Sequence, residues 1–105
     1  MDRTVEIAGQ SYRLCYSVNA LCEAERIAGG SLDGLMDRQF SACRLLLWAA
    51  LMEKQRGMTL EDAGEIITRH LRMGGSLEEL VEICNEALSE AGFFGPAALR
   101  EDVQA

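Results

Sequence analysis

The stretch "LLLWAALM", Leu45–Met52, is the longest uninterrupted apolar run in the chain, and it stands between Arg44 and Glu53. A helix that is apolar on every side is buried on every side, unlike a surface helix with a single apolar stripe. Eight residues are far fewer than the ~20 that a helix needs to cross a bilayer. The sequence therefore predicts a central buried helix from about Gln39 to Gln55, ended by Gly57, and no membrane association.

The N-terminal segment predicts a β-hairpin over about residues 4–16. Apolar and polar residues alternate in two short runs, and Gly9-Gln10 lies between them, as a type II′ turn with glycine first would require. Apolar pairs then share one face and a charged pair lies on the other. The cross-strand pairs predicted by this register are Ile7–Tyr12, Val5–Leu14 and Glu6–Arg13.

Helix start and stop signals divide the chain between the hairpin and residue 91. Ser17, Thr59 and Ser76 are predicted N-caps, the last two within capping boxes. Glycine pairs at 29–30 and 74–75 end the preceding helices, because glycine accepts the left-handed conformation of a helix end. The predicted helices are 17–28, a short one at 31–36 capped by Ser31, 39–55, 59–72 and 77–91.

Two of these helices have apolar stripes that we expect to face the core. In the first helix the stripe is Val18, Leu21, Cys22, Ala24 and Ala28, and in the closing helix it is Leu77, Leu80, Val81, Cys84, Leu88 and Ala91. We expect residues 95–105 to be a frayed tail. The predicted fold is thus a single domain over 1–105, mainly α with an N-terminal β-hairpin (α+β): a small helical bundle of four to five helices around the central apolar helix.

Composition narrows the class of partner. Of the 105 residues, 17 are acidic and 10 basic, a net charge of −7. Binding nucleic acid requires a clustered cationic surface, so we expect no nucleic-acid partner.

Asp2 and Arg3 lead directly into the predicted strand, so we expect no signal peptide and a cytoplasmic protein. We therefore expect the four cysteines to be reduced thiols that act as small apolar core residues, not disulfides.

The closing helix carries the strongest charge signal. Glutamates stand at positions 78, 79, 82, 86 and 90, with no basic residue between Ser76 and Gly92. One interpretation is a solvated helix face paired with neighbouring arginines, and the other is an acidic docking surface for a basic protein. Phe93 and Phe94 follow directly and either cover the end of the bundle or form an exposed anchor. The residues predicted to form a partner interface are Glu79, Glu82, Glu86, Phe93 and Phe94.

The tetrapeptide "GGSL" occurs twice, at Gly29–Leu32 and Gly74–Leu77. Small acidic helical carrier proteins bear phosphopantetheine on a serine at a helix N-terminus, and such a terminus favours a phosphodiester. The familiar carrier motif has aspartate directly before that serine, where this chain has Gly30 and Gly75. We therefore interpret both copies as a helix stop followed by an N-cap. No nucleophile, base and orienting group can be assembled from the sequence, so we expect no catalytic residues, no metal ligands and no cofactor.

Three stretches, in order, resemble the phage tail assembly chaperones of the gene-transfer-agent type. The first is "YSVNALCEAERIAGGSL", similar to a family helix of pattern N-A-L-C-E-x-E that stops at glycine. The second is "RLLLWAALMEKQRGMTLEDAGEII", similar to an apolar "LLWAAL" helix, a turn and a "LTLEEAG" helix start. The third is the closing "LEELVEICNEAL". The likeness extends over about residues 4–94.

The resemblance implies a non-enzymatic role. Such proteins bind tape-measure and tail tube proteins during assembly in the host cytoplasm and are not expected in the finished particle. Some relatives are filed as tail tube components. Two alternatives stay open, namely a small acidic adaptor or regulatory protein with an unrelated basic partner, and an acyl-carrier-like protein.

Overall fold

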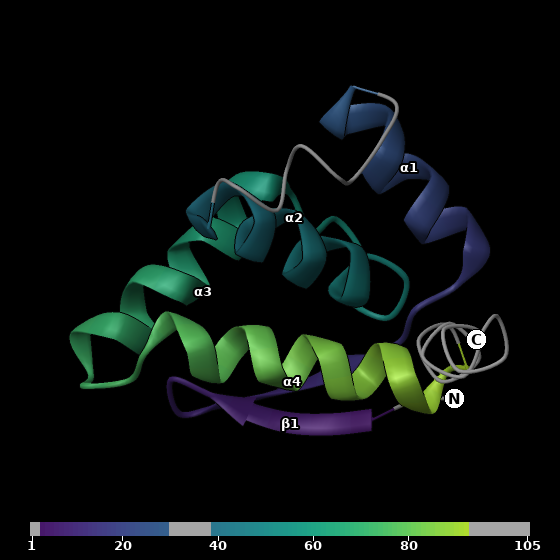
Figure 1. The fold of residues 1–105 in the computed structure, drawn as a ribbon. Helices are drawn as coiled ribbons and strands as arrows, with labels where there is room; N and C mark the ends of the chain where they lie inside the picture. Colours follow the sequence, from purple (N-terminus) through teal and green to yellow (C-terminus); the bar gives the residue numbers. More distant parts are fainter. Residues whose placement is uncertain (1–2, 30–38, 93–105) are drawn as a thin grey trace, which may run out of the picture.

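The computed structural model describes residues 3–29 and 39–92, and this part of the chain is mainly helical with an N-terminal antiparallel hairpin, as predicted (Figure 1). The described elements are β1 (Arg3–Ile7), β2 (Gln10–Leu14), α1 (Val18–Ala28), α2 (Gln39–Leu51), α3 (Leu60–Arg72) and α4 (Leu77–Glu90). The short helix predicted at 31–36 and the predicted frayed tail lie outside the described residues. None of the described helices has the length and hydropathy that a membrane span requires.

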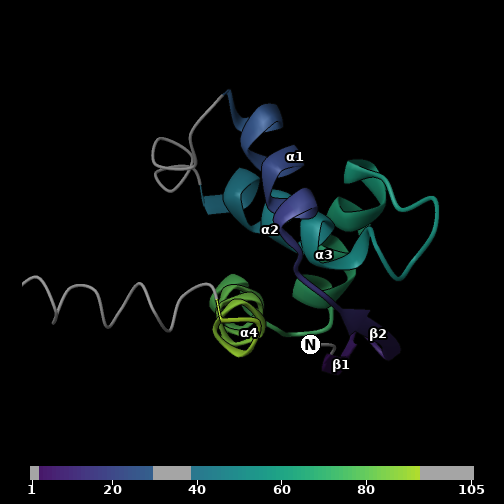
Figure 2. The same ribbon diagram turned by 90° about the vertical axis from the view of Figure 1, so that its right-hand side faces the viewer.

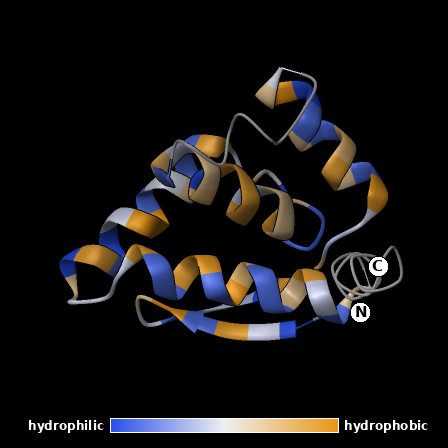
Figure 3. Cartoon of the chain, in the orientation of Figure 1, coloured by the Kyte–Doolittle hydropathy of each residue, from blue (hydrophilic) through white to orange (hydrophobic). Residues whose placement is uncertain are grey.

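Helix α2 is the most buried element. Eight of its thirteen residues are buried, which confirms the prediction made from the apolar run. It contacts α1, α3, α4 and strand β2, and the two views place it between these elements (Figures 1 and 2). Hydrophobic residues extend along most of its length (Figure 3). Burial on several sides therefore replaces the single apolar stripe of a surface helix.

The end of α2 differs from the prediction, because the helix stops at Leu51 and not at Gln55. The side chain of Gln55 turns back onto the hairpin. Its Nε2 donates to Leu51 O at 2.7 Å and to Arg13 O at 3.1 Å, and its Oε1 accepts from Arg13 N at 3.0 Å. The carboxamide thus takes the place of a neighbouring peptide group along the outer edge of β2.

The predicted hairpin register is wrong by two residues. The loop is Ala8-Gly9, with φ of 55° and 83°, and two successive positive φ values belong to a type I′ turn rather than type II′. The observed pairs are Ile7–Gln10, Glu6–Ser11, Val5–Tyr12, Thr4–Arg13 and Arg3–Leu14. A shift of two residues keeps every side chain on its predicted face, so the apolar alternation is satisfied equally well by either register.

Helix α1 has the predicted ends, and its predicted core-facing stripe is confirmed for Ala24, Leu21 and Ala28 but wrong for Val18 and Cys22. The Ser17 hydroxyl accepts from Ala20 N at 3.0 Å, and Gly29 ends the helix with φ of 99°. The buried residues are Ala20 and Ala24, and Leu21 and Ala28 are partly buried against the core. Val18, in contrast, is 62% exposed, and Cys22 is also exposed. The two alanines lie four residues apart on one face and allow α1 to pack closely on α2, where larger side chains would hold the helices apart.

Both predicted capping boxes are present. Asp62 N donates to Thr59 Oγ1 at 3.0 Å and Glu79 N to Ser76 Oγ at 3.2 Å, while each acid accepts in return from the backbone N–H of its cap residue. Gly74 supplies the left-handed conformation between α3 and α4, with φ of 94°. These local hydrogen bonds fix where α3 and α4 begin and therefore how they stand against α2.

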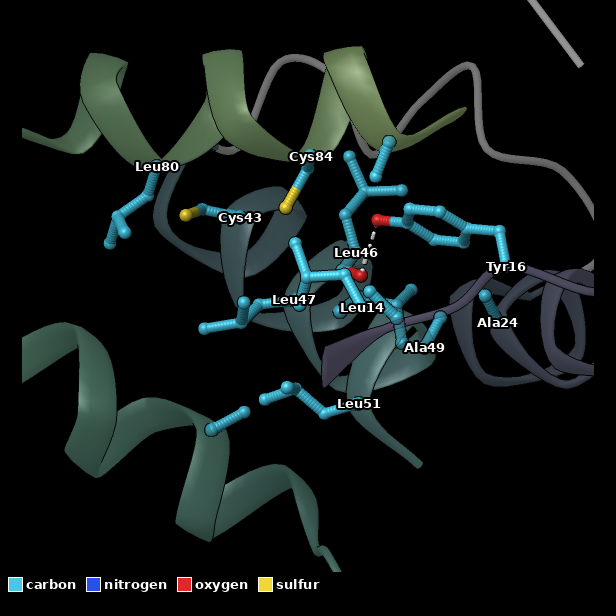
Figure 4. Packing of buried hydrophobic residues seen from close by; sticks show 14 of the residues in the cluster. Leu14, Tyr16, Ala24, Cys43, Leu46, Leu47, Ala49, Leu51, Leu80 and Cys84 are labelled. Carbon is cyan, nitrogen blue, oxygen red and sulfur yellow. Dashed lines mark hydrogen bonds between the residues drawn. The ribbon is translucent and has the colours of Figure 1, made fainter. Parts of the chain in front are cut away.

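The core joins all the described elements (Figure 4). Leu14, Leu47, Leu51 and Leu80 are fully buried, and the hydroxyl of buried Tyr16 donates to Leu46 O at 2.7 Å. Cys43 and Cys84 are buried between α2 and α4, as predicted for apolar core thiols. The prediction is wrong for Cys22, which lies on the exposed side of α1, and Cys15 is half-buried.

Candidate functional site

A groove of about 500 Å³ lies between the N-terminal half of α2 and the first part of α4. Its size is within the range of roughly 300–1,000 Å³ that is typical of sites for drug-sized ligands. Five lining residues come from α2 and six from α4. They are Gln39, Phe40, Ala42, Cys43 and Leu46, together with Leu77, Glu78, Glu79, Val81, Glu82 and Asn85.

The groove has an apolar floor and a polar rim. Ala42, Cys43 and Leu46 are buried residues of α2, and Leu77 and Val81 of α4 are partly buried against the same core. The remaining lining residues, from Gln39 and Phe40 on one side to the glutamates and Asn85 on the other, are exposed. A concave apolar surface bordered by a few polar groups is a typical site for a ligand or a partner side chain.

Phe40 stands at the edge of this groove with 68% of its surface exposed. It also lines a second hollow of about 290 Å³ on the other side of α2. Arg44 and Ser41 of α2 face α3 there, and the remaining lining residues are Gly64, Ile67, Thr68 and Leu71. Aromatic side chains are enriched at protein interfaces, where they serve as anchors, so the exposed Phe40 ring is a candidate contact for a partner.

The five glutamates of α4 fall into two groups. Glu86 pairs with Arg3 at 3.0 Å and Glu90 pairs with the same guanidinium, so these two hold β1 against α4. Glu79 accepts from Ser76 N at 2.9 Å and lies 3.2 Å from His70 Nε2. The hydrogen bond from Ser76 lowers the pKa of Glu79, with a smaller contribution from His70. Three of the acids thus act within the fold.

Glu78 and Glu82 form the second group. Within residues 3–29 and 39–92, neither side chain has a hydrogen bond or an ion pair, and both line the groove. They lie at i and i+4 on one helix, where like charges repel by a few tenths of a kcal/mol. The free negative charge of α4 is therefore gathered at the rim of the groove.

The predicted interface residues are distributed unevenly about this groove. Glu79 and Glu82 line it, whereas Glu86 is engaged with Arg3 and does not. Phe93 and Phe94 lie outside the described residues. Sequence reasoning missed Phe40 and Glu78. Phe40 could have been found from its position. It is an aromatic residue between the polar residues Gln39 and Ser41 at the start of a helix, where an amphipathic pattern predicts polar side chains.

The two buried cysteines and the single histidine have structural roles in the described part of the chain. Burial raises the pKa of Cys43 to about 11 and that of Cys84 to about 12, so both thiols are protonated and unreactive at neutral pH. His70 Nε2 lies 3.1 Å from Ser76 O, so it donates a hydrogen there and links the end of α3 to the start of α4. Among the described residues no three potential metal ligands converge.

Comparison with known proteins adds nothing to these observations: no family model, no curated protein and no solved structure matches the chain. The resemblance to tail assembly chaperones consequently rests on the three sequence stretches alone. The groove is the feature of the described chain that best fits the binding of another molecule.

Proposed function

We propose that this protein is a non-enzymatic assembly chaperone of the phage or gene-transfer-agent tail type, which binds a tape-measure or tail tube protein in the host cytoplasm and is absent from the finished particle. The observation that carries the proposal is the apolar groove between α2 and α4, with exposed Phe40 at its edge. A tape measure is a long helical protein whose apolar stripes are exposed before the tube encloses them. A groove of this kind can cover one such stripe.

The charge of the protein supports the same role. A net charge of −7 keeps a complex soluble through repulsion between copies. Chaperoning also requires a binding surface that releases its partner, and a small groove with an exposed rim suits an interface of modest affinity. A helical bundle around α2 would then be a rigid support for this surface, since the groove is built on two helices rather than on loops.

The carrier-protein alternative has less support. The Ser76 hydroxyl accepts the Glu79 N–H in a capping box, a role that fully accounts for a serine at this position. Ser31 lies outside the described residues. An intact-mass increase of ~340 Da after co-expression with a phosphopantetheinyl transferase, the mass of one phosphopantetheine group, would favour the carrier role over the chaperone role.

The adaptor alternative differs from the chaperone proposal in its partner, and one experiment separates them. The tagged full-length protein is co-expressed with each product of the genes flanking its own, and both soluble yield and co-purification are scored. We expect a long helical product to become soluble and to co-purify with the wild-type protein. If the products of the flanking genes are unrelated to virion assembly and none of them co-purifies, the chaperone proposal fails and the adaptor alternative gains support.

A pair of variants ties the result to the groove. Phe40→Ala removes an exposed ring that lines it, and Met73→Ala removes a similarly exposed side chain, 66% accessible, that does not line it. We expect Phe40→Ala to reduce co-purification strongly and Met73→Ala to leave it unchanged. Equal effects of the two substitutions would contradict the assignment of the groove.

A further inference from the structure

We propose that the α2–α4 groove selects an amphipathic helix that carries lysine or arginine beside its apolar stripe, and that Glu78 and Glu82 determine this choice. The inference rests on the proposed function, because it specifies the partner segment that the groove would bind. It adds a chemical requirement that an apolar groove by itself does not impose.

The shape of the groove argues for a helix. Its α4 wall runs from Leu77 to Asn85, which are eight residue steps apart and so span about 12 Å, or slightly more than two helical turns. The α2 wall is also helical, so the groove runs between two helical banks over an apolar floor. A partner helix laid between such banks contributes residues at i, i+3 or i+4, and i+7, the spacing used in helix-in-groove recognition.

Charge complementarity argues for basic flanking residues. Glu78 and Glu82 are exposed at the rim and have no partner within the described chain, while Glu79, Glu86 and Glu90 are already engaged. A lysine or arginine placed between Glu78 and Glu82 relieves their mutual repulsion and gains a charge-assisted contact. An acidic flank in the same place would meet two like charges.

The two sides of Phe40 differ in charge, which gives the bound helix an orientation. The α4 side carries Glu78 and Glu82, whereas the hollow on the α3 side carries Arg44. A partner helix that covers Phe40 is therefore expected to turn its basic flank toward α4 and an uncharged or acidic flank toward Arg44. Reversing the direction of the helix while its apolar stripe stays on the groove would place the basic flank against Arg44, and an acidic second flank would then meet Glu78 and Glu82.

The chain contains a closely matched control for the two rim acids. Glu61 and Glu65 occupy the second and sixth positions of α3, and Glu78 and Glu82 occupy the second and sixth positions of α4. All four are exposed, but Glu61 and Glu65 do not line the groove. The variants Glu78→Gln/Glu82→Gln and Glu61→Gln/Glu65→Gln therefore remove the same charge from equivalent helix positions.

The test uses three fluorescein-labelled 18-residue peptides with the same leucine stripe and with lysine, glutamine or glutamate beside it, each confirmed as helical by circular dichroism. Binding to the full-length protein is measured by fluorescence anisotropy at low and high salt. We expect the lysine peptide to bind most tightly and the glutamate peptide most weakly. Glu78→Gln/Glu82→Gln should weaken binding of the lysine peptide roughly three- to tenfold, the size expected for the loss of two exposed ion pairs. High salt should reduce the difference in affinity between the wild-type protein and this variant.

Several outcomes overturn the inference. They are equal binding of the three peptides, an unchanged affinity in Glu78→Gln/Glu82→Gln, or an equal loss in Glu61→Gln/Glu65→Gln. Absence of peptide binding, or a concentration-dependent dimer that Phe40→Ala dissociates, likewise overturns it, the latter by making a second copy the occupant. If a long helical protein still co-purifies on co-expression in these cases, the proposed function survives without the groove preference. If nothing co-purifies, both fail.

Discussion

The close packing of His70 against Gly75 leads to a prediction about stability. The effect of Gly75→Ala on the free energy of unfolding should change sign when His70 is replaced by alanine. Gly75 has ordinary backbone geometry, but a Cβ at this position would lie 2.2 Å from His70 Nε2. The imidazole therefore occupies the space of the missing side chain, and the glycine is required by packing rather than by backbone conformation. Gly75→Ala must displace the ring, whose side chain is only 16% exposed.

The expected cost follows from what the ring loses. Its hydrogen bond to Ser76 O, 3.1 Å long, contributes about 0.5–1.5 kcal/mol, and forcing a side chain out of a packed position costs about 1–3 kcal/mol. Replacing glycine by alanine returns about 0.4–1 kcal/mol by restricting the unfolded chain. We therefore expect Gly75→Ala to destabilise the wild-type protein by about 0.5–4 kcal/mol. In a His70→Ala background the clash is absent, so the same substitution should stabilise by about 0.4–1 kcal/mol.

The assay is urea unfolding of the four proteins of this double-mutant cycle, followed by circular dichroism. Gly57→Ala is the control, because Gly57 has φ of +78° and open space around it. Its cost comes from backbone strain and should be the same in the wild-type and His70→Ala backgrounds. The reasoning is refuted if Gly75→Ala destabilises equally in both backgrounds, since the cost would then not depend on the imidazole.

Further predictions concern the core and the titrating groups. Leu47→Ala should destabilise by about 2–5 kcal/mol in urea unfolding because Leu47 is fully buried, whereas Phe40→Ala should change stability by less than about 0.5 kcal/mol because its ring is exposed; comparable losses would contradict the burial assigned to either residue. The thiols of Cys43 and Cys84 should react with an aromatic disulfide reagent at pH 8 only as fast as the protein unfolds. Their raised pKa values mean that the folded protein keeps protons that the unfolded thiols lose near pH 9, so stability should decrease as the pH rises from 9 toward 11. Exposed Cys22 should label rapidly in the native protein, whereas rapid labelling located by mass spectrometry at Cys43 or Cys84 would refute their burial. The lowered pKa of Glu79 has the opposite effect on the pH dependence of stability. As the pH falls below 4.5, the unfolded chain takes up a proton at this residue before the folded chain does. Stability should therefore decrease as the pH falls through this range, and Glu79→Gln should make the decrease shallower in urea titrations at pH 3–6; an unchanged slope would contradict the capping contact.

The features that could be predicted from sequence depend on short-range signals. The caps at Ser17, Thr59 and Ser76 and the burial of α2 follow from residues within four positions of one another, and these predictions are confirmed. The hairpin register was not determined by such a signal. Gly9 can serve as the first or second residue of a two-residue loop, and the two choices leave the same side chains facing the core.

The features that could not be predicted depend on contacts between distant residues. Arg3 meets Glu86 and Glu90 only after the whole chain has folded, so the sequence could not separate the engaged glutamates of α4 from Glu78 and Glu82. The buried face of α1 was predicted only in part, because small residues are compatible with several helix faces. Ala24 was in the predicted stripe, whereas Ala20 was not, and packing against α2 selects the face that the two alanines share. The candidate interface thus needed the structure for its definition, although Glu79 and Glu82 were among the residues predicted.

The central claim is that this protein binds a helical partner through the groove between α2 and α4. The most direct measurement is an NMR titration of the isotope-labelled full-length protein with the partner that co-purifies with it, or with the lysine-flanked peptide. The largest chemical-shift changes are expected at residues that line the groove, namely Phe40, Ala42, Val81, Glu82 and Asn85, with small changes at Val18 and Ile27 of α1. Shift changes concentrated on α1 or on β1, with the groove residues unchanged, would contradict the claim.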